Sequence, residues 1–151
     1  IENRLSMIRK ITSVFLVVVW SMLIFSFSNQ DGSSSKKESD TLIDGISAIL
    51  KIKEENREKM TFPIRKFAHF FVYFVLGFLI FNMLHTFNLK CSSIFYISIV
   101  VCILFAGSDE LHQYFIQDRS AKISDALLDS SAALIGIYTY YILTRKKYEN
   151  K

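Results

Sequence analysis

Residues 67–89 read FAHFFVYFVLGFLIFNMLHTFNL and contain no Asp, Glu, Lys or Arg. Two more runs, residues 11–27 and 91–108, are equally free of these charges, and residues 126–144 carry only Asp129. A membrane-spanning helix needs about 20 mostly apolar residues, and all four runs come close to that length. Because unpaired strand edges cannot be satisfied in lipid, the runs are predicted to be helices. The sequence therefore predicts an all-α membrane protein with four spans.

The predicted architecture is a four-helix transmembrane bundle that forms a single domain over residues 1–151. The spans are expected at about residues 8–27, 64–85, 93–115 and 125–145. Residues 41–59 combine an apolar stripe at helical spacing with a strongly charged stretch. This segment is too short and too polar to span, so we expect an extra amphipathic helix in the first extracytoplasmic loop, on the membrane surface or over the mouth of the bundle.

The net charge is +4, and basic residues gather near the two ends of the chain. Three lie within residues 4–10, before the first run, and three more are residues 145–147, after the last. The positive-inside rule then places both termini in the cytoplasm, as an even number of spans requires. This distribution explains the basic charge without a nucleic acid as partner.

Polar residues recur at alternate ends of the four runs, and an up-and-down bundle brings these ends to one face of the membrane. The set comprises Gln30, Lys66, His69, Tyr73, Asp109, Glu110, His112, Gln113, Arg119, Asp125 and Asp129. Each charge held in hydrocarbon costs roughly 2.5 kcal/mol or more even on lenient scales. The predicted orientation makes this face extracytoplasmic, and the set is the candidate functional site.

Helical spacing places Lys66, His69 and Tyr73 on one face of the second span. A purely structural role stays open for each, because a lysine at a helix end can reach the headgroups and the other two can hydrogen-bond between helices. Gly77 continues this face, and residues 132–136 include two alanines and a glycine on the fourth span. Such small-residue surfaces favour close helix packing.

Two carboxylates begin the fourth span. The helix dipole favours an acid at Asp125, near the first turn. Asp129 lies one turn deeper and needs a partner, for which Arg119, Lys66 and His69 are the candidates.

The chemistry of the set supports two interpretations. In the first, Glu110, Asp109 and His69 act as general acid and base, while Lys66 and Arg119 hold an anionic headgroup. In the second, the acids and a histidine bind a divalent metal, but the spacing lacks the paired histidines of the HExxH zinc helix. We therefore expect no cofactor, although a carboxylate site for Mg²⁺ or Ca²⁺ stays open. The other members are expected to bind or orient substrate: Gln30, Tyr73, His112, Gln113, Asp125 and Asp129.

Three blocks of these residues occur in a recognisable combination. They are Arg65-Lys66-Phe-Ala-His69 with Tyr73 and Leu76-Gly77, then Asp109-Glu110-Leu-His112-Gln113, then Arg119 with Ser124-Asp125 and Gly136. With these blocks, and with Phe25-Ser-Phe-Ser-Asn-Gln30, the chain resembles the VanZ-like family of bacterial integral membrane proteins. Asp129 stands where that family usually has Asn, and Asp118 precedes the loop arginine where glycine is common.

The resemblance implies a bacterial cell membrane and a link to resistance against teicoplanin, a lipoglycopeptide that acts at the outer surface. It supplies no reaction. We expect the site to bind a cell-envelope amphiphile, either a membrane lipid or a lipid-linked precursor, and leave open whether it modifies that molecule as an enzyme would.

Two alternatives belong to other functional classes. A small proton- or ion-coupled transporter needs polar groups through the whole bundle, yet the inner end offers chiefly His85. A non-catalytic scaffold subunit would use the polar set only to join helices. The sequence contains no feature that fixes the oligomeric state.

Overall fold

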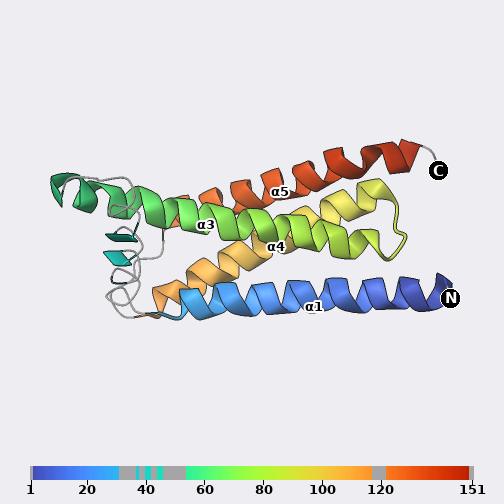
Figure 1. Ribbon diagram of the computed structural model, residues 1–151, viewed down its shortest axis with the longest axis horizontal. Coiled ribbons are helices and arrows are strands. Elements are labelled where there is room, and N and C mark those ends of the chain that lie inside the picture. Colours follow the sequence, from blue (N-terminus) through green and yellow to red (C-terminus); the bar gives the residue numbers. More distant parts are fainter. Residues whose placement is uncertain are drawn as a thin grey trace.

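The computed structural model describes residues 2–30, 37, 40–41, 44–45, 54–116 and 122–149. Its long helices are α1 (Glu2–Ser28), α3 (Glu54–His85), α4 (Cys91–Tyr114) and α5 (Ile123–Glu149). They run alternately up and down, so both chain ends lie at one end of the bundle (Figure 1). Each contains a segment long and apolar enough to cross a membrane. The predicted all-α bundle with four spans is therefore confirmed for the part of the chain that the structure describes.

The second span begins earlier than its apolar pattern predicts. The sequence predicts a start near residue 64, but α3 begins at Glu54 and contains Pro63. Proline lacks a backbone N–H and so loses one bond to the preceding turn, while its fixed φ still suits a helix. Residues 54–59, assigned above to the amphipathic helix 41–59, are thus continuous with α3. Most of that predicted helix lies outside the described residues.

Gly77 of α3 and Gly136 of α5 lie where these two helices touch. A Cβ atom at Gly77 would overlap the backbone carbonyl of Ala133, and one at Gly136 would overlap the carbonyl of Phe74. The backbones approach this closely because neither glycine has a side chain. The small-residue surfaces predicted on the two spans therefore form a direct seam between α3 and α5.

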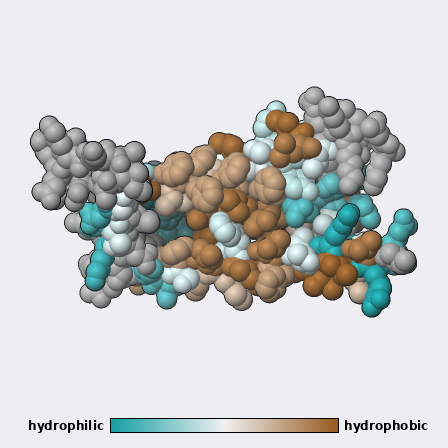
Figure 2. All heavy atoms as spheres, viewed as in Figure 1, coloured by the Kyte–Doolittle hydropathy of each residue, from teal (hydrophilic) through white to brown (hydrophobic). Residues whose placement is uncertain are grey.

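An apolar core fills the middle of the bundle along this seam. Leu76 and Phe81 of α3, Ile94 and Cys102 of α4, and Ile137 of α5 are all buried. On the face shown in Figure 2, hydrophobic residues occupy the middle of the molecule, and hydrophilic ones gather towards both ends. This arrangement matches a bilayer, whose hydrocarbon core is about 30 Å thick.

Helix α1 lies at the edge of the bundle. Its buried residues are Ser13, Ile24 and Ser28, and the indole N–H of Trp20 donates a 2.9 Å hydrogen bond to the carbonyl of Val72. Phe15 is 63% exposed and is one of many large apolar side chains on the outer surface of this helix. Such a surface suits lipid, so α1 is a peripheral span attached mainly to α3.

Candidate functional site

The described polar residues of the predicted site lie at the end of the bundle opposite the chain termini. This end, called here the carboxylate end, carries the acids Asp109, Glu110, Asp125 and Asp129. The C-terminal turn of α4 supplies the first two, and the beginning of α5 supplies the others. Antiparallel neighbours bring these turns together with the start of the α3 span and the last turn of α1 (Figure 1).

Lys66 of α3 forms an ion pair with Asp125 of α5. Asp125 also accepts a 3.1 Å hydrogen bond from the hydroxyl of Ser124. The two charged side chains are 30% and 28% exposed. The pair therefore lies at the rim of the site, where solvent or headgroups can reach it.

Asp129 is buried one turn deeper, with an exposed fraction of 1%. Its nearest basic partner among the described residues is His69, whose Nδ1 lies 3.5 Å from Oδ2. Of the three candidates for partner of Asp129, Arg119 lies outside the described residues and Lys66 pairs with Asp125. Among the described candidates, His69 is therefore the residue that pairs with Asp129.

Tyr73, one turn further along α3 than His69, is fully buried. It lies within electrostatic range of Asp109, Asp129 and Glu110, and its ring meets Phe105 edge-on with centroids 6.2 Å apart. The phenol is thus the innermost polar group of the carboxylate end.

The neighbouring carboxylates of α4 have different surroundings. Asp109 accepts a 3.0 Å hydrogen bond from the side-chain amide of Gln113 through Oδ2. Glu110 accepts a 2.5 Å hydrogen bond from the backbone N–H of Lys122, just before α5. Glu110 therefore fixes the beginning of α5 against α4, which is a positioning role that its sequence context did not reveal.

Two predicted members lie at or beside α1 instead. The ring of His112 stacks on Phe25 with centroids 4.6 Å apart, and its Nε2 lies 3.3 Å from the side-chain oxygen of Asn29. Gln30 is half-buried just beyond the end of α1. His112 therefore joins the peripheral helix to the site rather than completing the carboxylate cluster.

Several buried oxygens at this end have no hydrogen-bond partner among the described residues. They are the hydroxyl of Ser28, Oδ1 of Asp129, and the hydroxyl of Tyr73 with Oδ1 of Asp109. Tyr73 and Asp109 are close enough to interact with each other, so Oδ1 of Asp129 is the clearest case at this end. A buried polar atom without a partner costs about 1–3 kcal/mol, and more when the group is charged. The carboxylate oxygens in this set are hydrogen-bond acceptors, and a bound molecule with N–H or O–H groups would satisfy them.

The metal interpretation gains no support from this geometry. Within the described ranges, no three His, Cys, Asp or Glu side chains converge closely enough to hold a metal ion. The acids instead occupy separate interactions with Lys66, His69, Gln113 and a backbone amide.

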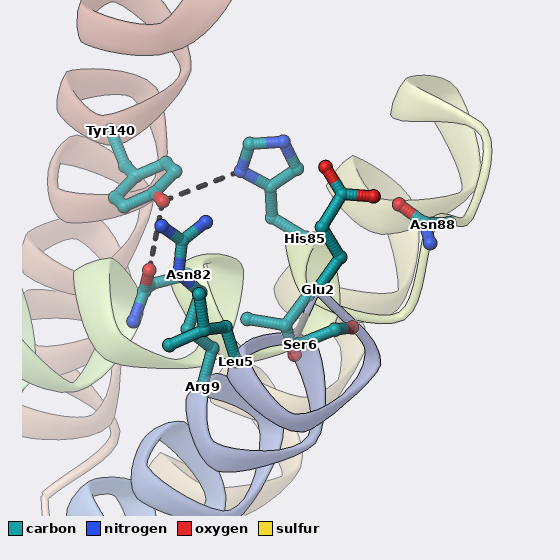
Figure 3. Close-up of a pocket in the computed structure, with 9 residues that line it drawn as sticks. Glu2, Leu5, Ser6, Arg9, Asn82, His85, Asn88 and Tyr140 are labelled. Atoms are coloured by element: carbon teal, nitrogen blue, oxygen red, sulfur yellow. Dashed lines mark hydrogen bonds between the residues drawn. The ribbon is translucent and has the colours of Figure 1, made fainter.

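A second polar cluster, at the termini end, exceeds what the sequence analysis expected there. The hydroxyl of Tyr140 donates a 2.8 Å hydrogen bond to the side-chain oxygen of Asn82 and lies 3.3 Å from Nδ1 of His85. These residues border a cavity that Arg9 and Glu2 of α1 also line (Figure 3). Asn82 is a single amide in an apolar run, and Tyr140 is one of three tyrosines within residues 138–141, so only their tertiary proximity reveals the cluster.

Four apolar helices with polar groups at both ends define a multi-pass membrane protein. The VanZ/LLP1 family matches residues 13–144, which include the C-terminal part of the first span and the whole of the other three. The chain therefore belongs to the VanZ/LLP1 family, as the sequence blocks around Lys66, Asp109 and Asp125 predict. No match was found among curated proteins or among solved structures.

Proposed function

We propose that the carboxylate end binds the polar headgroup of a cell-envelope amphiphile that donates hydrogen bonds through hydroxyl or amine groups. The observation that carries this proposal is the buried Oδ1 of Asp129, which has no hydrogen-bond partner among the described residues and lies near the buried Tyr73 and Asp109. Carboxylate oxygens are acceptors only, so a ligand that satisfies them must bring donors. Sugar hydroxyls and amines of lipid-linked envelope precursors have this chemistry.

The charges of the site support a donor-rich ligand more than an anionic one. The described cluster holds four carboxylates, and Lys66 already forms an ion pair with Asp125. We therefore place Lys66 at the rim of the site, and the predicted role of Lys66 in holding an anionic headgroup stays a prediction. The contribution of Arg119 stays a prediction, because that residue lies outside the described chain.

An outward-facing site agrees with the distribution of basic residues. The termini end carries the basic segments 4–10 and 145–147, which the positive-inside rule assigns to the cytoplasm. The carboxylate end then faces the outer leaflet of a bacterial cell membrane. A ligand there would be an envelope lipid or precursor, consistent with the family's association with teicoplanin resistance.

If the bound molecule is also modified, His69 is the best-placed group to transfer a proton. An imidazole held by a buried carboxylate is a common arrangement for acid–base work, and His69 beside Asp129 has it at 3.5 Å. Glu110, in contrast, accepts a backbone hydrogen bond and acts as a positioning residue. This assignment favours His69 among the three predicted acid–base candidates.

A transporter has less support. Between Tyr73 and the Asn82–Tyr140 pair, the buried side chains described on α3 and α5 are apolar, including Leu76, Ile80 and Ile137. A proton or ion pathway needs polar groups or water through this region. Ser98 of α4 is the one buried polar side chain described between the two polar ends, and we therefore treat the ends as separate sites.

The test compares wild type with Asp129→Asn and with the control Ser131→Ala. Ser131 is exposed on the same helix and bonds only its own helix backbone in the described structure. Native mass spectrometry would count lipids retained from a Gram-positive membrane extract, and thermal unfolding would verify that the proteins are folded. We expect Asp129→Asn to lose a specifically retained species that the control keeps. Identical lipid profiles in all three would refute the proposal.

A cellular experiment tests whether lipid binding is connected to the teicoplanin resistance with which the family is associated. Lipoglycopeptide susceptibility would be measured in a Gram-positive host that expresses each variant at matched membrane levels. Protection that disappears with Asp129→Asn and persists with Ser131→Ala supports an envelope function. If protection and thermal stability instead decline together in every site variant, the polar residues only hold the helices together, as the scaffold alternative requires.

A further inference from the structure

The cavity at the termini end has the size and composition of a ligand site. Its volume is about 600 Å³, within the range of small-molecule sites, which is roughly 300–1,000 Å³. Its polar lining includes Arg9, Ser6, Asn82, His85 and Tyr140 from three helices. The carboxylate end and its proposed ligand do not involve these residues.

The cavity lies over α3, between the two helices that flank it. α1 and α5 each pack against α3 and α4, and the lining comes from α1, α3 with the residues that follow it, and α5. Leu5 belongs to the lining and is 53% exposed. The cavity lining therefore combines polar groups with an exposed apolar side chain near the headgroup level.

The depth of the cavity corresponds to a headgroup layer. At 1.5 Å per residue, Arg9 and Ser28 are about 28 Å apart along α1. This separation approaches the thickness of the hydrocarbon core, about 30 Å. With Ser28 at one face of the bilayer, Arg9 reaches the phosphate level of the other face.

The polar side chains are held in place before any ligand binds. Because the hydroxyl proton of Tyr140 goes to Asn82, the 3.3 Å contact with His85 requires Nδ1 to donate to the tyrosine oxygen. This chain of hydrogen bonds fixes the imidazole at the cavity wall. In Figure 3 the guanidinium of Arg9 extends towards Tyr140 and Asn82, whereas the carboxylate of Glu2 extends towards Asn88.

We propose that this cavity binds the headgroup of a membrane phospholipid from the leaflet at the termini end. Arg9 would hold the phosphate, since a guanidinium makes paired, charge-assisted hydrogen bonds to phosphate oxygens. Glu2, which extends in another direction, would accept hydrogen bonds from a headgroup ammonium. One base and one acid in the same cavity match a zwitterionic headgroup such as phosphoethanolamine. A free phosphate compound shares the phosphate chemistry but lacks acyl chains.

Three probes separate these sources: phosphatidylethanolamine, diacylglycerol with the same acyl chains, and soluble glycerophosphoethanolamine. The delipidated full-length chain would be titrated with each, and native mass spectrometry would count bound molecules. We expect phosphatidylethanolamine to bind at least about tenfold better than either other probe, the scale of one charged hydrogen bond. Equal binding of diacylglycerol overturns the proposal, and equal binding of the soluble probe overturns the lipid source.

Variants locate the binding. Arg9→Gln should lower phosphatidylethanolamine binding about tenfold, whereas Arg4→Gln, exposed on the same helix outside the cavity, should keep it. Glu2→Gln should remove the preference for phosphatidylethanolamine over phosphatidylglycerol. Arg9 is exposed, so its substitution leaves the core intact. Unchanged binding in Arg9→Gln, or equal losses in Arg9→Gln and Arg4→Gln, would place the lipid elsewhere, whatever the outcome at the carboxylate end.

Discussion

The two polar ends of this bundle are stabilised by different interactions. The carboxylate end buries acids, of which Asp129 is 1% exposed and has His69 as its described partner. The termini end uses a hydrogen-bonded chain from His85 through Tyr140 to Asn82 beside an open cavity. A buried charge depends on its partner far more than a buried neutral group does. The first end is therefore built around charge compensation, and the second around hydrogen-bond geometry.

This difference also separates what each end can do. Carboxylates with unsatisfied oxygens favour donor-bearing ligands. The termini end presents a guanidinium and an already satisfied network, which favour an acceptor such as phosphate. The apolar seam between α3 and α5 keeps the two environments apart.

The largest expected effect comes from the seam that both ends share. Gly136→Ala places a methyl group against the carbonyl of Phe74, so we expect a loss of about 3 kcal/mol, the upper part of the overpacking range. Gly107→Ala is the matched control, because no atom lies within 4 Å of its added Cβ, and it should be neutral or slightly stabilising. Thermal unfolding in detergent measures both. Equal stability of the two variants would show that the close approach is not limiting.

The second-largest effect is expected at the carboxylate end, where it tests whether His69 stabilises the buried charge of Asp129. His69→Leu leaves Asp129 buried without its partner, so we expect a loss of about 2 kcal/mol. Adding Asp129→Asn should recover most of that loss, because the uncompensated charge disappears with it. Thermal unfolding of wild type, both single variants and the double variant gives the coupling. If the double variant is less stable than His69→Leu alone, the pair does not function through charge.

A smaller effect is expected at the termini end. Tyr140→Phe leaves the oxygen of Asn82 and the ring nitrogen of His85 without this partner, which should cost about 1 kcal/mol. Tyr138→Phe, on the exposed side of the same helix, is the control and should change little. Chemical denaturation in detergent measures the difference. A loss as large for Tyr138→Phe as for Tyr140→Phe would contradict the network.

The smallest effect is expected at the rim. Lys66 and Asp125 are about one-third exposed, and ion pairs with this exposure contribute up to about 1 kcal/mol. A double-mutant cycle with Lys66→Met and Asp125→Asn should therefore give a coupling energy below that of His69 and Asp129. Raising the salt concentration should weaken it further. A coupling energy larger for Lys66–Asp125 than for His69–Asp129 would contradict the conclusion that the buried pair contributes more than the exposed one.

The sequence by itself determined the number of spans and the face on which the acids gather. Both follow from local properties, since an uncharged run of about 20 residues must be helical in lipid and successive spans must reverse direction. The small residues that permit the α3–α5 seam were also recognisable, because Gly77 and Gly136 continue polar or small faces at helical spacing. The beginning of α3 was misplaced, because propensity alone treats Pro63 as a boundary.

Only the tertiary structure decided which partner each polar group takes. Asp129 had three candidates and lies beside His69, Glu110 accepts the amide of Lys122, and His112 turns to α1. These outcomes depend on the rotation and axial offset of whole helices, which are set where the backbones of α3 and α5 touch. The Asn82–Tyr140 pair shows the same limit, because its members are 58 positions apart in the chain. Neither the lone amide of Asn82 nor the choice among three nearby tyrosines identifies the partner from the sequence.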